Sequence, residues 1–435
     1  MDTAVLSLVL IISMLLMLAC GLWVALSLVG VALIGMLLAG NEQIGLLFAT
    51  STWGASTGWS LTALPLFIWM GEILFRTRLS EDLFKGLSPW LNALPGQLLH
   101  VNVLSCGIFA AVSGSSAATA ATIGRMTLPE LKARGYSDRM AVGTLAGSGT
   151  LGLLIPPSII LIVYGVAAEV SISRLFIAGA LPGLLLIVLF MGYTMFWSLL
   201  NSDQLPARER TRIPLASRIK ALRQLLPIVL LIAFVLGSIY GGLTTPTEAA
   251  ALGVLGALFL AMATGALSLE SFQQSLLGGV KSSCMIGLIL VGAHFLTISM
   301  GFLGIPRALA EWIGMLSLSP LELLIYLTVL FVILGCFLDG ISVVVLTTAV
   351  VLPMVQQAGI DLLWFGIYIV LVVEMSQITP PVGFNLFVIQ ALTGKDILYV
   401  ARAALPFFLL ILLAVLLITW FPEIATYLPT TMTQR

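Results

Sequence analysis

The 435-residue sequence has very little charge. Only 9% of its residues are Asp, Glu, Lys or Arg, and the net charge is zero, whereas an average soluble domain carries about 25% charged residues. Without an excess of positive charge the chain has no general attraction for nucleic acid, and we expect it to bind none. The sequence also lacks a Walker-type glycine loop, which excludes ATP hydrolysis by that route.

Residues that bind metals or perform acid–base catalysis are scarce. The only histidines, His100 and His294, are far apart, and the four cysteines form no CxxC pair. A zinc site needs several such residues at short spacing, so we expect no such site and no enzyme. An intramembrane enzyme is the alternative from a different class. It would need a paired nucleophile and base, and no Ser–His pair at helical spacing supplies one.

Long apolar runs are what the sequence does contain. Hydrophobic residues make up 60% of the chain and its mean hydropathy is +1.14. With about 20 residues per membrane span, this composition predicts an all-α polytopic membrane protein. The expected elements are two spans within 4–40 divided near Gly21, a connection at 41–58, spans at 59–75, 176–200, 225–241, 248–266, 285–303 and 404–421, broken spans at 140–165 and 362–391, and hairpins at 96–129 and 320–356.

The run from 113 to 122 stands out because it contains no large side chain. Its hydroxyl residues are Ser113, Ser115, Ser116, Thr119 and Thr122. Irregular polar backbone survives in a membrane only where it is buried in protein or lines a cavity. We interpret the run as the tip of a re-entrant hairpin that binds a ligand. A small-residue face for helix packing is the alternative.

A shift of 224 residues superimposes three landmarks of the two halves. Each half contains a hairpin with a polar tip, a proline in its second arm, and then a helix interrupted by Pro-Pro. The matched positions are Pro129 with Pro353, Pro156-Pro157 with Pro380-Pro381, and Ser115-Ser116 with Asp339-Gly340. Inverted repeats of this kind are typical of secondary transporters, whose sites lie where discontinuous helices meet.

The basic residues indicate the orientation in the membrane, because Lys and Arg collect in cytoplasmic loops. If both hairpins return to the side they enter, only Arg174, Arg307 and Arg435 fall outside. Both termini then lie outside, and the two hairpins enter from opposite faces. The cytoplasmic connections are 76–95, 125–139, 201–224, 267–284 and 393–403.

The Pro-Pro pairs free backbone carbonyls before them, because proline removes a donor and disrupts the preceding turn. Carbonyl and hydroxyl oxygens suit hard cations. We therefore expect one cation site where Ser113, Ser115 and Ser116 face the break at Pro156. A second is expected where Gly340 and Ser342 face Ser376 and Thr379.

Three carboxylates are expected at membrane depth, where charge is costly and indicates function. We interpret Asp339, at the second tip, as a binding or coupling residue. Glu72 and Glu374 could have the same functional role, but each could instead form a structural ion pair or lie near the membrane interface.

Several motifs resemble the large membrane subunit of tripartite ATP-independent periplasmic (TRAP) transporters, and the similarity extends over essentially the whole chain. The motif at 240–251 is the most specific, although Thr245-Pro246-Thr247-Glu248 also fits a helix start. The matching stretches are Ser-Gly-Ser-Ser-Ala-Ala-Thr at 113–119, Gly-Leu-Leu-Ile-Pro-Pro-Ser at 152–158, Tyr-Gly-Gly-Leu-Thr-Thr-Pro-Thr-Glu-Ala-Ala-Ala at 240–251, Gly-Cys-Phe-Leu-Asp-Gly at 335–340 and Thr-Pro-Pro-Val-Gly at 379–383.

This resemblance implies a sodium-coupled, elevator-type importer in a bacterial or archaeal inner membrane, with sodium as coupling ion and no other cofactor. Its partners would be a small four-helix membrane subunit and a periplasmic binding protein that delivers an organic anion, such as a dicarboxylate or sialic acid. Positions matching the family's sodium sites are Ser113, Ser116, Gly335, Ser376, Thr379 and Val382. Substrate-binding or coupling roles are expected for Ser115, Thr119, Asp339, Gly340 and Ser342.

The expected division of the chain follows from the same reasoning. A stand-alone sodium/carboxylate symporter of the same broad fold is the alternative function, and a channel fits two inverted, plugged halves less well. The expected parts are scaffold helices at 1–95, the first transport half at 96–165, further scaffold at 166–303 with the loop 201–224, the second transport half at 304–395, and a C-terminal span at 396–435.

Overall fold

The computed structural model describes residues 3–77, 79–206, 214–308 and 318–432. These residues form helices, turns and loops and contain no strand, which confirms the all-α prediction for the described part of the chain. Five of the arginines used to orient the chain lie outside the described residues: Arg78, Arg208, Arg210, Arg212 and Arg435.

Six described helices are long and apolar enough to cross a membrane. The N-terminal run is divided as expected, because Gly21, with φ +78°, separates α1 (Thr3–Ala19) from α2 (Val24–Leu38). The six long helices are α10 (Ile172–Leu200), α11 (Leu215–Tyr240), α12 (Pro246–Ala263), α13 (Leu269–Phe302), α16 (Gly340–Gln357) and α19 (Ile397–Trp420).

Three of the expected connections, 41–58, 201–224 and 267–284, contain helix. Residues 41–58 contain the helix α3 (Ile44–Ser56), which a bend of 58° separates from 59–75 (η1, Trp59–Thr62, and α4, Ala63–Phe75). Within α3, the hydroxyls of Thr50 and Thr52 donate to carbonyls one turn earlier, so these polar side chains find their partners inside the helix. In addition, α11 and α13 begin about ten or more residues before their apolar spans, and a short helix, α20 (Glu423–Met432), ends the described chain.

Two helical hairpins and two interrupted helices occur where the sequence predicts them. Their bounds are α6 (Leu99–Ser113) with α7 (Ser116–Ala133), α8 (Asp138–Thr150) with η2 (Leu151–Leu153) and α9 (Ile159–Ala167), α15 (Pro320–Gly335) with α16, and α17 (Leu362–Gln377) with α18 (Phe384–Thr393). Both Pro-Pro peptide bonds in the interruptions are cis.

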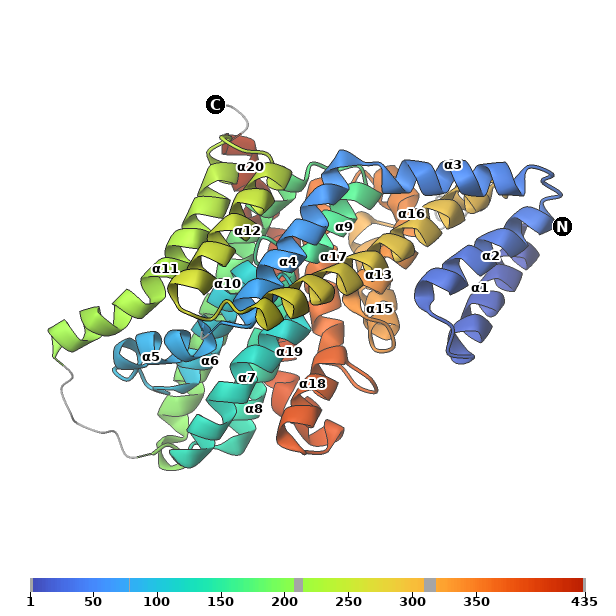
Figure 1. Cartoon of the computed structure of the whole chain (residues 1–435). Coiled ribbons are helices and arrows are strands. Elements are labelled where there is room, and N and C mark those ends of the chain that lie inside the picture. The colour runs from blue at the N-terminus through green and yellow to red at the C-terminus, as the bar shows by residue number, and fades with distance from the viewer. Residues whose placement is uncertain (1–2, 78, 207–213, 309–317, 433–435) are drawn as a thin grey trace.

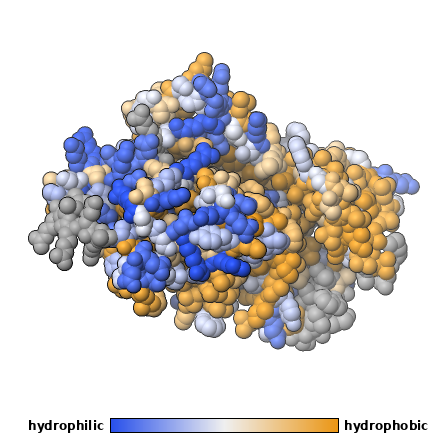
Figure 2. Space-filling view, turned by 90° about the horizontal axis from the view of Figure 1, so that it is seen from below, coloured by the Kyte–Doolittle hydropathy of each residue, from blue (hydrophilic) through white to orange (hydrophobic). Residues whose placement is uncertain are grey.

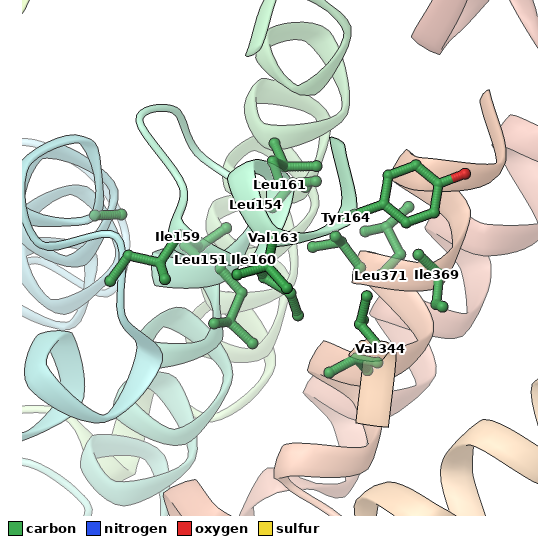
Figure 3. Packing of buried hydrophobic residues seen from close by; sticks show 14 of the residues in the cluster. Leu151, Leu154, Ile159, Ile160, Leu161, Val163, Tyr164, Val344, Ile369 and Leu371 are labelled. Atoms are coloured by element: carbon green, nitrogen blue, oxygen red, sulfur yellow. The ribbon is translucent and has the colours of Figure 1, made fainter. Parts of the chain in front are cut away.

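The helices pack in two groups that share α4 as a common neighbour. The long helix α13 packs against α2, α3 and α4, and α4 packs against α12 (Figure 1). The hairpin α6–α7 packs on α8, and α15 and α16 pack on α17, while α10 and α19 contact both halves. Figure 3 shows the apolar core where the halves meet: Ile160 and Tyr164 of α9 lie beside Val344 of α16 and Leu371 of α17.

One end of the molecule is hydrophilic. Figure 2, a view from below onto the lower ends of α7, α8 and α18 in Figure 1, shows polar side chains gathered over the middle and left of this face and apolar ones mainly on its right side and along its lower edge. A cavity of about 400 Å³ at these helices is lined by Arg125, Lys132, Asp138 and Lys395, among others. The Asp138 carboxylate lies 3.1 Å from the Lys395 ammonium and raises the pKa of that group by this contact. The charged groups thus cluster where the sequence places cytoplasmic connections.

Candidate functional site

The tip of the first hairpin lies directly on the first helix interruption. Gly114, with φ +58°, ends α6, and a Cβ on it would lie 2.9 Å from the Pro157 carbonyl oxygen. On the opposite side, a Cβ on Gly152 would overlap the carbonyl oxygen of Ser115. Both contacts involve backbone, which does not adapt easily. The structure therefore brings together the tip and the break that the sequence predicts to face each other.

The hydroxyls at this tip form a local network centred on the Ser115 carbonyl oxygen. The Thr119 hydroxyl donates to it at 2.8 Å and the Ser113 hydroxyl at 3.3 Å, while those two hydroxyls lie 2.8 Å apart. Ser115 also caps α7, because its side chain accepts from the amide of Ala118. Ser116 is 4% exposed at the start of α7. A dense group of oxygens thus lies beside a helix break.

The second hairpin makes the corresponding contact with the second interruption. Gly335, at the end of α15, packs so closely on Ser376 that a Cβ on Gly335 would overlap the Ser376 hydroxyl. The backbone N–H of Gly383, just after the Pro-Pro pair, donates to the Cys336 carbonyl at 3.3 Å. The expectation that Gly340 faces Ser376 and Thr379 is not the contact seen. A Cβ on Gly340 would instead meet Val373, Ile160 and Leu153.

Asp339 acts as the N-cap of α16. Its carboxylate accepts from the amides of Ile341 at 3.1 Å and Ser342 at 3.2 Å, and from the Ser342 hydroxyl. A carboxylate at a helix N-terminus is stabilised by the helix dipole and by the free N–H groups. Asp339 is half-buried, and the hydrogen bonds at the start of α16 hold its carboxyl group in place at the tip.

Two predicted sodium ligands near the second break are less enclosed. The Thr379 hydroxyl donates to the Met375 carbonyl at 2.8 Å, and Val382 is half-buried. At the first break, Ser158 satisfies the Leu153 carbonyl through its hydroxyl. Side chains therefore recover part of the hydrogen bonding that the prolines remove, and fewer carbonyls stay free than the sequence suggests.

The two remaining carboxylates at expected membrane depth have different surroundings. Glu72 pairs with Arg76 at 3.3 Å and its side chain is 29% exposed, which favours the structural reading. Glu374 is 0% exposed, and neither of its carboxyl oxygens has a hydrogen-bond partner among the described residues.

The Thr245–Glu248 motif forms a capping box at the start of α12, which agrees with its interpretation as a helix start.

Sequence reasoning did not predict the close contacts of the glycines on which the tips rest. Gly114, Gly152 and Gly383 make the close backbone contacts, and their position within the Ser-Gly-Ser-Ser and Pro-Pro motifs was the available signal. Gln377 and Asn385, with unpartnered buried amides around the second break, were also missed. Nothing in a single sequence marks these two amides as buried.

The overall fold is shared with membrane transporters. The YdaH transporter of Alcanivorax borkumensis superimposes with a TM-score of 0.61 at 16% identity, covering 96% of this chain and 98% of that one. MtrF of Neisseria gonorrhoeae, described as an antimetabolite efflux pump, gives a TM-score of 0.53 at 13% identity, covering 88% and 84%. With six helices long and apolar enough to cross a membrane in the described residues, the fold is that of a multi-pass membrane protein.

A more specific match comes from the sequence. The family model described as "Tripartite ATP-independent periplasmic transporter, DctM component" matches residues 11–424. The chain therefore belongs to this family, which confirms the resemblance seen in its motifs.

The relatives of this chain are named for several different solutes. The chain is 35% identical to the C4-dicarboxylate TRAP transporter large permease protein DctM of Pseudomonas aeruginosa, over 86% of this chain and 87% of that one. It is 30% identical to the sialic acid large permease SiaM of Vibrio cholerae, over 94% and 95%. It is 33% identical to the isethionate permease DctMQ of Oleidesulfovibrio alaskensis, over 84% of this chain and 58% of that one. These relatives are permease proteins and not enzymes.

Proposed function

We propose that the chain is the large permease subunit of a sodium-coupled secondary transporter that imports an organic anion. The observation that carries the proposal is the packing of each hairpin tip on a helix interruption, at Gly152 in one half and at Ser376 in the other. Oxygen-rich tips at discontinuous helices are the usual place for coupling ions and substrates in secondary transporters. Sodium is the coupling ion, and no other cofactor is required.

The substrate is a carboxylate or a similar organic acid. Relatives are named for C4-dicarboxylates, sialic acid and isethionate, which differ in size but share an anionic group. The first tip carries only small side chains, and neither described tip carries a basic residue. An anion would therefore be held by hydroxyls, helix N-termini and bound sodium. We place most of the solute selectivity in a periplasmic binding protein.

The proposed mechanism is an elevator. The hairpins α6–α7 and α15–α16 are re-entrant, enter from opposite faces as parts of an inverted repeat, and move with the two broken helices. Because α10 and α19 contact both halves, we add them to the transport parts at 96–165 and 304–395. The scaffold comprises residues 1–95 and those residues of 166–303 that lie outside α10.

Two partners and a location complete the proposal. A small four-helix membrane subunit binds the scaffold, and a soluble periplasmic protein delivers the solute. The isethionate relative is named DctMQ, and this chain covers little more than half of its length, which agrees with a further membrane part in that protein. The complex lies in a bacterial inner membrane with both termini of this chain in the periplasm.

Uptake by proteoliposomes tests this function. The chain is reconstituted with and without its small subunit and binding protein, and a sodium gradient is imposed with C4-dicarboxylates and sialic acid as labelled probes. We expect uptake only when all three proteins and sodium are present. Uptake driven by sodium with this chain alone would establish the stand-alone symporter instead, and uptake unaffected by sodium would contradict the coupling.

Ser116→Ala tests the first sodium site. We expect the sodium concentration for half-maximal uptake to rise by roughly tenfold to a hundredfold, because an oxygen that interacts with a charged group contributes about 1.5–3 kcal/mol and 1.4 kcal/mol is about tenfold. Ser105→Ala is the matched control, since Ser105 is also buried in the first hairpin. Unchanged sodium activation in Ser116→Ala would remove this residue from the site.

A further inference from the structure

The cavity of about 400 Å³ at the charged end of the molecule has no role in the proposed transport cycle. Its size is that of a small-molecule site, and its basic lining residues are Arg125, Lys132 and Lys395. Arg125 and Lys132 are seven residues apart on α7, so both lie on one face of that helix. Lys395 comes from the loop after α18. Three cationic groups thus converge on one cavity from two elements far apart in the sequence.

The acid in the described lining, Asp138, is already engaged. Its carboxylate lies 3.1 Å from the Lys395 ammonium and accepts a hydrogen bond from the Tyr399 hydroxyl at 3.1 Å. The Lys395 ammonium also lies 5.3 Å from the centroid of the Tyr399 ring. These three side chains form a group that is fixed at one side of the cavity and neutralises one of the three cations.

Arg125 and Lys132 have no acidic partner among the described residues. The nearby acid of α7, Glu130, pairs with Arg134 at 2.6 Å, and none of the described ion pairs includes Arg125 or Lys132. The central carbon of the Arg125 guanidinium lies 6.0 Å from the centroid of the Phe75 ring, a contact that leaves its charge in place. The cavity therefore keeps two positive charges that the described protein groups do not balance.

The same cavity has an apolar part. Leu128, Pro129, Ala141 and Leu392 line it together with the basic residues. Leu392 packs on Gly124, where an added Cβ would lie 2.9 Å from the Leu392 side chain. A phospholipid headgroup matches this lining, because its anionic phosphate is joined to a glycerol unit that carries acyl chains. A small soluble anion would use only the basic part.

Helix α18 offers a surface for the acyl chains. Phe384 and Phe387 are each 46% exposed and lie three residues apart, on one side of the helix that also supplies Leu392 to the cavity. Basic cavities between helices at the cytoplasmic membrane surface are suited to the headgroups of anionic lipids. The charges and the apolar surface therefore point to the same kind of ligand.

The cavity is separate from the first hairpin tip. Arg125 and Lys132 follow Ser116, the first residue of α7, by 9 and 16 residues. At 1.5 Å per helical residue these separations are about 14 and 24 Å. A ligand bound between the two basic side chains would therefore not occupy the expected sodium site.

We propose that this cavity binds the phosphate headgroup of an anionic phospholipid, such as phosphatidylglycerol, from the membrane leaflet at the charged end of the molecule. Arg125 and Lys132 donate charge-assisted hydrogen bonds to the phosphate oxygens, and the apolar part contacts the glycerol and the first acyl carbons. The inference goes beyond the proposed transport function, because the binding needs neither sodium nor a transported solute.

Lipid titration of the purified full chain, followed by native mass spectrometry, tests the proposal. The protein in detergent receives either phosphatidylglycerol or phosphatidylcholine with the same acyl chains. We expect the wild type to bind phosphatidylglycerol in preference. In Arg125→Gln/Lys132→Gln the affinity for phosphatidylglycerol should fall by roughly thirtyfold, about fivefold for each charge removed. Binding of phosphatidylcholine should not change.

Lys85→Gln/Arg134→Gln is the matched control. It removes the same number of positive charges, but both side chains are exposed and paired with a glutamate one turn earlier. It should bind phosphatidylglycerol like the wild type. Thermal unfolding checks that all variants are folded. If the double variant of the cavity is not, Lys132→Gln alone should lose about fivefold in affinity.

Three results would overturn the proposal. A wild type that does not prefer phosphatidylglycerol has no headgroup site. An equal loss of affinity in the control would mean that only the net charge matters. Displacement of phosphatidylglycerol by an equal concentration of glycerol 3-phosphate would mean that the cavity takes a soluble anion and not a lipid. Failure of the transport proposal is distinguishable, because it would appear as absence of sodium-driven uptake while lipid binding remains.

Discussion

Gly152→Ala is expected to reduce uptake by roughly tenfold to a hundredfold. The added methyl group would overlap the Ser115 carbonyl, and its nearest contacts are all backbone atoms of the first tip. Overpacking of this kind costs about 1–3 kcal/mol, and 1.4 kcal/mol is about a factor of ten. This free energy destabilises the close packing of the first tip on the helix interruption. Sodium affinity should therefore fall together with the transport rate.

The matched control is Gly192→Ala in α10, where an added Cβ meets no atom within 4 Å. We expect this variant to transport normally. Thermal unfolding of both purified variants separates a local change at the site from loss of the fold. Wild-type uptake in a stably folded Gly152→Ala would show that close contact at this tip is not needed.

Asp339→Asn is expected to abolish most uptake, by at least about tenfold, while the protein stays folded. Asn is as good an N-cap as Asp, so the hydrogen bonds to the amides of Ile341 and Ser342 can persist. What the substitution removes is the negative charge at the second tip. Initial rates of sodium-driven uptake, with unfolding temperature measured in parallel, check this expectation.

Asp361→Asn provides the control for capping. Asp361 caps α17 by accepting from the Trp364 amide at 2.8 Å, but it is exposed at the far end of that helix. It should retain full uptake. Equal loss of uptake in both variants would mean that replacing any capping aspartate impairs uptake, and would remove the special role of the charge at the second tip.

Much of the fold could be predicted because its signals are local. Pro156-Pro157 and Pro380-Pro381 interrupt helices for steric reasons, and the small residues at 113–122 are unusual in an apolar chain. The structure places both features as expected, with each tip against an interruption. Helix α3 and the early start of α13 could not be predicted from hydropathy. Polar side chains in a helix satisfy themselves by local hydrogen bonds or extend into water.

The site itself was less accessible to sequence reasoning. The resemblance implies sodium-site positions at both Gly335 and Ser376, but it does not predict that these two residues pack on each other. That contact and the packing of Gly340 on Leu153 depend on how the chain folds in three dimensions. Asp339 was singled out as a charge, whereas its capping role depends on the start of α16 at the next residue. Glu374 could be noted as an intramembrane acid, but only burial and the lack of partners distinguish it from the ion-paired Glu72.

Cross-linking between α4 and the first hairpin tests the central claim, which is that the hairpin unit moves against the scaffold. Gly71 of α4 lies against the backbone of Val112: a Cβ added to Gly71 would lie 3.1 Å from the Val112 carbonyl oxygen. Gly71→Cys and Val112→Cys are introduced together after the native Cys20, Cys106, Cys284 and Cys336 are replaced by serine. Each single variant must first show uptake.

The measurement is sodium-driven uptake by the double variant before cross-linking, after treatment with a short thiol-specific cross-linker that can be cleaved by reductant, and after reduction. The account predicts that cross-linking stops uptake and that reduction restores it, because the tip must leave α4 during each cycle. Complete cross-linking with undiminished uptake would contradict the elevator mechanism.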